Sequence, residues 1–258
     1  MYVKRTVKCG CVVEIRKMFP GRAGKKGTRG KNVGATDEAQ QKKNERRAEE
    51  NLRWKLNANF RAGDYHVVLH YGDKERTFEQ CRSDLCKFLR ELRKLCKAKN
   101  LPCRYIACTE TKRMTNIHHH VVMTKIPLEV ISQAWDTIEG TASVSLRPLD
   151  RRGNHAELAS YLMKECRSTM KRYKEMGTRG KRFSCSRHLI MPVPEYETIE
   201  ARAWSKEPKA RKGSYLWKDK DGNTAFNFED EETGKLQQVY FEIYLDRQDG
   251  HKWTEVCT

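Results

Sequence analysis

The chain has 258 residues, with 52 Lys and Arg against 34 Asp and Glu, which gives a net charge of +18. This length suits one large domain with appendages, and it allows a packed core without disulfide staples. No run approaches the roughly 20 apolar residues of a membrane span, and the charged first residues are unlike a secretory signal. These features exclude a membrane protein, a secreted miniprotein and a collagen-like fibre. The charge indicates a polyanionic partner, most simply nucleic acid.

The ten cysteines do not form paired CxxC knuckles, so a structural zinc module is not expected. The two closest approaches to a metal site, Cys9-Gly10-Cys11 and Cys185 to His188, each supply only half of one. Most of the cysteines lie in helix-like or strand-like patterns. We therefore expect small buried thiols in the reducing environment of a cytoplasm.

The first 63 residues form the most cationic part of the chain for their length, with a net charge of +11. Residues 21–34 are rich in Gly, Lys and Arg and predict a mobile basic loop that contains Lys25 and Lys26. Residues 37–57 predict a solvated helix that carries Arg46, Arg47 and Arg53. Such a helix is either a charged surface without special function or a contact to the DNA backbone. We treat residues 1–63 as a basic arm and helix.

Residues 64–176 carry clear periodic patterns. A strand over 65–71 is followed by a helix that opens with a capping box at Thr77 and ends at Asn100. Two strands over 103–110 and 117–124, a helix starting at Pro127, a strand over 143–147 and a last helix from Asn154 to about Met176 follow. The order β-α-β-β-α-β predicts an α+β fold with a ferredoxin-like or RRM-like split antiparallel sheet. The extra helix is free to cover the open sheet face.

The strand over 117–124 contains three consecutive histidines. Alternate residues of a strand share a face, so His118 and His120 point one way while His119 points the other way. Glu110, at the end of the preceding strand, can reach the same face as this pair. Two imidazoles and a carboxylate suit a divalent metal and leave positions for water and a phosphate oxygen. Taken alone, a His-x-His pair is more often solvated or hydrogen-bonded than a metal site. We regard His70 as a reserve ligand with a more structural role.

The last helix adds a candidate nucleophile. Tyr161 falls at the edge of its apolar stripe, and Lys164 follows at i+3 on the same side. A phenol is a weak nucleophile at neutral pH unless a nearby cation favours its phenolate form. By itself, Tyr161 could equally be an edge-of-core tyrosine beside an exposed lysine.

The His118-His119-His120 strand, followed on a later helix by Tyr161-Leu162-Met163-Lys164, resembles the HUH endonucleases. Within that superfamily the chain is most similar to replication-associated (Rep) proteins of small phages, plasmids and bacterial mobile elements. The resemblance covers about residues 60–200, including Ser184 to Arg187. It implies a cytoplasmic enzyme of a bacterial or phage-infected cell.

The resemblance also implies a mechanism and partners. His118, His120 and Glu110 would hold Mg²⁺ or Mn²⁺, Tyr161 would attack the scissile phosphate to give a 5′-phosphotyrosyl link, and Lys164 would neutralise charge there. The substrate would be single-stranded origin DNA, with a stem-loop, held also by Arg113 and Arg187. Host helicase and polymerase would be further partners, because no Walker A sequence occurs in the chain.

Two positions depart from the family pattern. The middle residue of the histidine motif is usually hydrophobic, and here it is His119, which is either a core histidine or a sign of an altered site. A second tyrosine one turn before the first occurs in some relatives, and here that position is Glu157, so a single-tyrosine enzyme is expected. Residues 201–258 predict a small β-rich appendage to the endonuclease domain at 64–200.

Two other interpretations remain open. The same chemistry could serve a transposase or a relaxase. The chain could also be a non-catalytic, RRM-like binder of single-stranded nucleic acid, although such domains favour exposed aromatic residues where this central strand has histidines.

Overall fold

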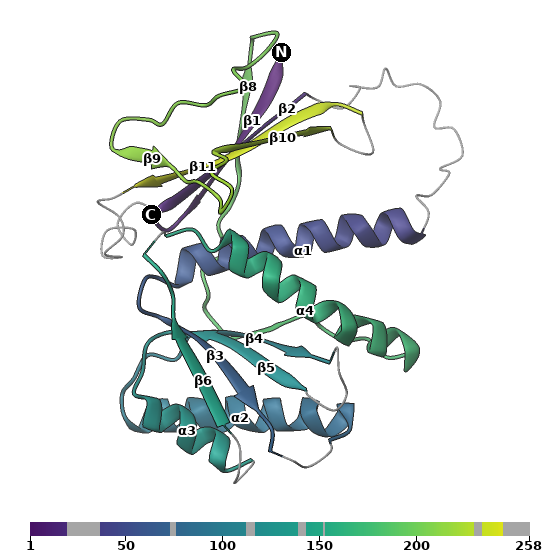
Figure 1. Cartoon of the computed structure of the whole chain (residues 1–258), viewed down its shortest axis with the longest axis vertical. Coiled ribbons are helices and arrows are strands. Elements are labelled where there is room, and N and C mark those ends of the chain that lie inside the picture. The colour runs from purple at the N-terminus through teal and green to yellow at the C-terminus, as the bar shows by residue number, and fades with distance from the viewer. Residues whose placement is uncertain are drawn as a thin grey trace. The chain divides into compact units, whose positions relative to one another are not determined.

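The computed structural model describes residues 1–19, 37–72, 76–111, 117–138, 143–151, 153–229 and 234–244. The chain forms two compact units, each with its own antiparallel sheet (Figure 1). The first unit combines residues 1–58, the short stretch 153–155 and the residues from 190 onward. The second unit consists of residues 59–151 and 156–189. The predicted α+β class is confirmed.

The first unit has six strands in the order β10-β11-β2-β1-β8, with β9 paired to β11. Its helix α1 is joined to the sheet by Trp54, whose indole nitrogen donates a hydrogen bond to Glu14 in β2. The elements are β1 (Tyr2–Cys9), β2 (Val12–Met18), α1 (Asp37–Asn59), β8 (Glu195–Ile199), β9 (Ser214–Leu216), β10 (Ala225–Glu229) and β11 (Leu236–Tyr244).

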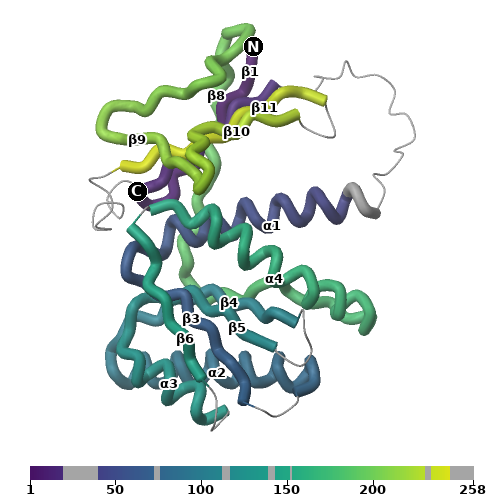
Figure 2. The backbone as a smooth tube through the Cα atoms, viewed as in Figure 1, coloured from purple at the N-terminus to yellow at the C-terminus, as the bar shows by residue number. Residues whose placement is uncertain are grey.

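This unit divides the chain differently from the sequence analysis, which separated 1–63 from 201–258. Both segments contribute to one sheet, because β2 near the start of the chain pairs with β11, as in Ile15 opposite Tyr240 (Figure 2). The β1–β2 hairpin was not predicted either. Lys and Arg occupy positions of β1 on both faces, and one of them, Arg5, is buried, so the strand period was hidden by charge.

The second unit follows the predicted order of elements. Its five strands are antiparallel in the order β6-β3-β5-β4-β7, so the first and third strands in sequence lie at the centre. The elements are β3 (Tyr65–His70), α2 (Phe78–Ala98), β4 (Tyr105–Glu110), β5 (His118–Met123), α3 (Leu128–Asp136), β6 (Ser143–Pro148), α4 (Ala156–Glu175) and β7 (Ser184–Cys185).

Helices cover both faces of this second sheet (Figure 1). Helices α2 and α3 pack on one face through a core that contains Phe88, Leu92, Val121 and Trp135. Helix α4 lies on the other face, where the Thr169 hydroxyl donates to the carbonyl oxygen of Thr109 at 2.6 Å. The predicted capping box at Thr77 is present at the start of α2. The sheet face beneath α4 is therefore the place where buried strand residues meet the helix that carries Tyr161.

Two general expectations can be compared with the described residues. Every one of the nine cysteines in these ranges is a free thiol, and most of them are buried. None of the helices in these ranges combines the length and the apolar character that crossing a bilayer requires.

Candidate active site

The central strand β5 places its histidines as the strand period predicts. His119 is fully buried on the α2/α3 side, between the hydroxyls of Tyr71 and Thr109, which lie 2.8 and 2.9 Å from its two ring nitrogens. His118 and His120 lie on the opposite face, the one covered by α4. The identification of His119 as a core histidine thus holds, and this residue does not face the site.

On the α4 side, His120 is the centre of a buried hydrogen-bonded chain. Its Nε2 lies 3.1 Å from the Oε2 of Glu110, and its Nδ1 lies 3.2 Å from the Nε2 of His66 in β3. Burial, followed by the effect of His120, lowers the pKa of His66 to about 4, and burial followed by His118 lowers that of His120 to about 4. Both imidazoles are therefore neutral at pH 7, which is the form that binds a metal.

Glu110 connects the two histidines of the motif. The same Oε2 atom that contacts His120 lies 4.0 Å from the Nδ1 of His118, which is directly opposite Glu110 in the strand pairing. His70 is edge-to-face with His118, with ring centroids 4.6 Å apart, and its Nε2 lies 3.1 Å from the hydroxyl of Ser145. The bond to Ser145 agrees with a structural role for His70.

The donor set fits a divalent cation in chemical type and in proximity. Two neutral imidazoles and a carboxylate converge at one end of adjacent strands, as Mn²⁺ or Mg²⁺ with substrate oxygens would require. Within the described ranges, however, no three His, Cys, Asp or Glu side chains are already arranged around a common point. Metal binding would therefore require His118, His120 and Glu110 to turn from the hydrogen-bonded arrangement described above.

Tyr161 lies over the histidines. Its ring is edge-to-face with His120 at 5.5 Å and with His66 at 6.2 Å between centroids, and the residue is 41% exposed. Partial burial, and then the carboxylates of Glu165 and Glu110, raise the pKa of Tyr161, while Arg147 acts in the opposite direction. The phenol is thus accessible, but its phenolate needs added positive charge. Lys164, one turn further along α4, is exposed.

Two residues of this site were missed by the sequence analysis. His66 was noted only as part of an alternating strand, yet it contacts His120 directly. Arg147 in β6 lies opposite His66 in the strand pairing and influences the charge of both His66 and Tyr161. The alternation along β3 puts His66 on the His120 face, but the register that brings the two together is not visible in the sequence.

The predicted nucleic-acid contacts have different surroundings. Arg46, Arg47 and Arg187 are exposed. Arg53 lies instead inside the first unit, where its guanidinium donates to Glu14 at 2.8–2.9 Å. This pairing leaves Arg53 little capacity for a phosphate, because it is needed to neutralise a buried carboxylate. Lys25, Lys26 and Arg113 lie outside the described residues.

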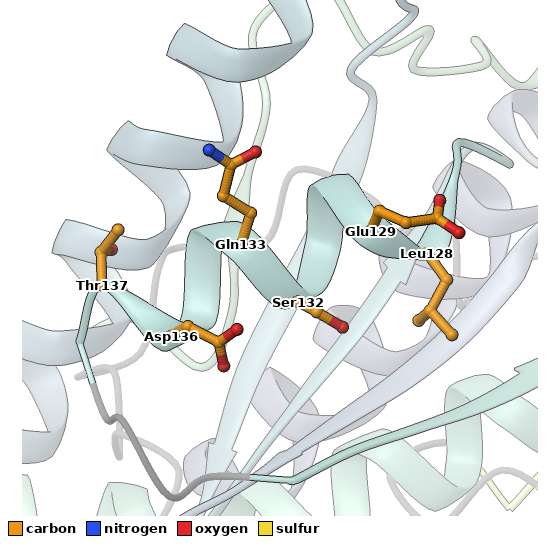
Figure 3. A pocket seen from close by; sticks show the side chains of 6 residues that line it. All are labelled: Leu128, Glu129, Ser132, Gln133, Asp136 and Thr137. Atoms are coloured by element: carbon orange, nitrogen blue, oxygen red, sulfur yellow. The ribbon is translucent and has the colours of Figure 1, made fainter.

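A surface hollow of about 640 Å³ runs along α3 (Figure 3). Its lining is mixed and partly acidic, with Glu129 and Asp136 beside Leu128 and Gln133. It offers no histidine, tyrosine or cation, and α3 lies on the opposite sheet face from the His66–His120 pair. The hollow is therefore not the candidate active site.

Comparison with protein families places this site in a known context. Residues 64–170 match the model of a family described as replication-associated protein, of the ORF2 type. The match runs from the start of β3 into α4, so it contains Glu110, the histidine strand and Tyr161. Searches of curated proteins and of solved structures found no match. The matched segment is thus similar to replication-associated proteins, which supports a replication initiator with DNA as its partner.

Proposed function

We propose that the protein is a rolling-circle replication initiator that nicks and rejoins single-stranded DNA at a specific site through Tyr161. The observation that carries this proposal is the position of Tyr161 over His120, with the ring centroids 5.5 Å apart, inside the segment that matches the replication-associated family. A nucleophile exposed to solvent above a cluster of neutral imidazoles and a carboxylate suits attack on a phosphodiester.

In the proposed reaction, the Tyr161 oxygen attacks the scissile phosphorus in line. A new phosphorus–oxygen bond forms to the tyrosine, the bond to the 3′ oxygen breaks, and that oxygen takes up a proton to become a 3′-hydroxyl. The phosphotyrosyl ester retains the energy of the broken phosphodiester, so a later 3′-hydroxyl can reverse the step and rejoin the strand. The free 3′-hydroxyl can meanwhile prime synthesis.

The residues around Tyr161 have separate roles in this scheme. His118, His120 and Glu110 would hold Mg²⁺ or Mn²⁺, which supplies Lewis-acid stabilisation of charge at the phosphate. Lys164 and Arg147 would place positive charge near the phenolate and the phosphate, offsetting Glu110 and Glu165, which oppose ionisation of Tyr161. A transposase or relaxase would use the same chemistry, and the family match favours replication between them.

The test is covalent capture of DNA. The protein is incubated with Mn²⁺ and a pool of random-sequence single strands, and adducts are separated on a denaturing gel and sequenced to find the preferred nick site. We expect an adduct with the native protein and with Tyr173→Phe, a control on the same helix, but none with Tyr161→Phe. Failure to form any adduct, or an adduct that survives Tyr161→Phe, would reject the proposal. Metal-independent binding that is unaffected by His120→Ala would favour the non-catalytic binder instead.

A further inference from the structure

The exposed side of α4 carries a line of cations that begins beside Tyr161. Lys164, Arg167, Lys171 and Lys174 follow at i, i+3, i+7 and i+10, and all four are exposed. This spacing keeps the four side chains on one side of a helix. The opposite side is buried against the unit, through Ala159, Leu162, Met163, Cys166, Thr169 and Tyr173.

The positive charge continues beyond the end of α4. Residues 161–187 contain nine Lys and Arg against two Glu, and Arg179 and Lys181 are exposed as well. This following segment is held to the same unit, because the Cys166 thiol contacts the carbonyl oxygen of Arg182 at 3.1 Å and β7 pairs with β4. The basic surface is thus attached to the element that carries Tyr161.

We propose that Lys164, Arg167, Lys171 and Lys174, here called the α4 track, bind the phosphate backbone of the single strand on one side of the nick. The inference rests on the proposed function for the identity of the strand. Ten residues of helix span about 15 Å, which matches about four phosphates at the 3.4 Å spacing of a B-form strand. A strand whose scissile phosphate lies at Tyr161 meets Lys164 one helical turn away.

The observation that favours a strand at this site over general attraction to charge is its position relative to Tyr161. Helix α2 has a similar line of exposed cations, Arg90, Lys94 and Lys97. That line lies on the other layer of the unit, separated from Tyr161 by the sheet, and Lys94 is paired with Glu91 at 3.2 Å. A strand held at Tyr161 has direct access to α4 and has none to α2.

The two helices provide a matched pair of variants. Arg167→Gln/Lys171→Gln/Lys174→Gln changes an Arg, a Lys and a Lys at i, i+4 and i+7, and Arg90→Gln/Lys94→Gln/Lys97→Gln changes the same residue types at the same spacing. Gln favours helix and all six residues are exposed, so both variants should fold, which circular dichroism checks. Lys164 is left unchanged because it belongs to the proposed catalytic machinery.

Binding is measured by fluorescence anisotropy with labelled (dT)20 at several salt concentrations. We expect the α4 variant to lose about tenfold or more in affinity, and its salt dependence to weaken by about 2 log units per log unit of salt, from three lost phosphate contacts. The α2 variant should lose less than about twofold. Equal losses in the two variants, or no loss in the α4 variant, would overturn the inference.

A second measurement locates the strand and separates this inference from the proposed chemistry. Acylation of lysines by an activated ester, read by mass spectrometry, should show that (dT)20 protects Lys171 and Lys174 but leaves Lys94 and Lys97 reactive, in the native protein and in Tyr161→Phe. Protection without any covalent adduct would support the track and reject the nicking chemistry. An adduct at Tyr161 with no protection on α4 would reject the track alone.

Discussion

His66 and His120 face each other across the neighbouring strands β3 and β5, with the Nε2 of His66 at 3.2 Å from the Nδ1 of His120. Because the Nε2 of His120 faces Glu110, His66 occupies the position of an outer partner to a motif histidine. Such a partner fixes the ring orientation and the tautomer of the histidine that it contacts. When the Nε2 of His120 binds a cation, its Nδ1 carries the proton and His66 can accept it.

We therefore predict that His66→Ala weakens metal use without removing the nucleophile. Loss of an outer partner typically costs about 10- to 100-fold in metal affinity or activity. The measurement is the initial rate of adduct formation as a function of Mn²⁺ concentration, where the half-saturating concentration should rise. His70→Ala is the control, because His70 lies on the same strand and face but contacts Ser145. Equal effects of the two substitutions would argue against a special role for His66.

Glu110 should control metal binding itself, since its Oε2 is the atom nearest to both motif histidines. Glu110→Gln keeps the shape of the side chain but removes the charge that a hard cation requires. We expect the electron paramagnetic resonance signal of free Mn²⁺ to fall on titration with native protein, and to fall much less with Glu110→Gln or His118→Ala. Glu129→Gln, on the exposed side of α3, should behave as the native protein does. Mn²⁺ binding that is unchanged by Glu110→Gln would remove this carboxylate from the proposed ligand set.

Stability should depend on pH through the buried histidines. Burial, and then His120 and His118, lower the pKa of His119 to about 3, whereas an unfolded histidine titrates near 6.5. Below pH 6.5 the unfolded chain binds a proton that folded His119 does not, so stability is full above this pH and falls as the pH decreases toward 3. His119 alone accounts for about 2 kcal/mol lost between pH 7.5 and 5. His66 and His120, with pKa values of about 4, act in the same direction.

Urea unfolding in EDTA at pH 7.5 and pH 5 tests this prediction. His119→Gln should be less stable than the native protein at pH 7.5, since one amide cannot replace both contacts, to Tyr71 and Thr109. Its loss of stability between the two pH values should nevertheless be smaller by about 2 kcal/mol. The same pH-dependent loss in both proteins would show that His119 does not cause it.

Most of the second unit was predictable from local sequence patterns. The capping box at Thr77, the helical period of α2 and the alternation along β5 each depend on neighbouring residues, and all three are present in the structure. The placement of His118 and His120 on one face with Glu110 followed from the same alternation. The contact between His66 and His120 depends on the register between two strands about 50 residues apart, which no local pattern specifies.

The first unit was not predictable in this way. The pairing of β2 with β11 joins distant parts of the chain. Arg5 and Arg53 appear in the sequence as members of a basic arm, yet both are bound to the buried carboxylate of Glu14. A lysine or arginine available for DNA and one that neutralises a buried acid have the same sequence pattern, and only the fold separates them.

Glu14 should be essential for the stability of the first unit. It is 1% exposed and accepts hydrogen bonds from Arg5, Arg53 and Trp54 at 2.9–3.0 Å. Glu14→Ala leaves buried cations without their partner, and breaking a buried ion pair on one side costs about 3 to 5 kcal/mol. Glu197→Ala on the same sheet removes an exposed pair with Lys4, 2.8 Å long, which should cost less than about 1 kcal/mol. Thermal unfolding monitored by circular dichroism measures both variants. Similar melting temperatures for the two would show that the Glu14 network contributes no more than a surface pair, and Arg53 would then return to the candidates for DNA contact.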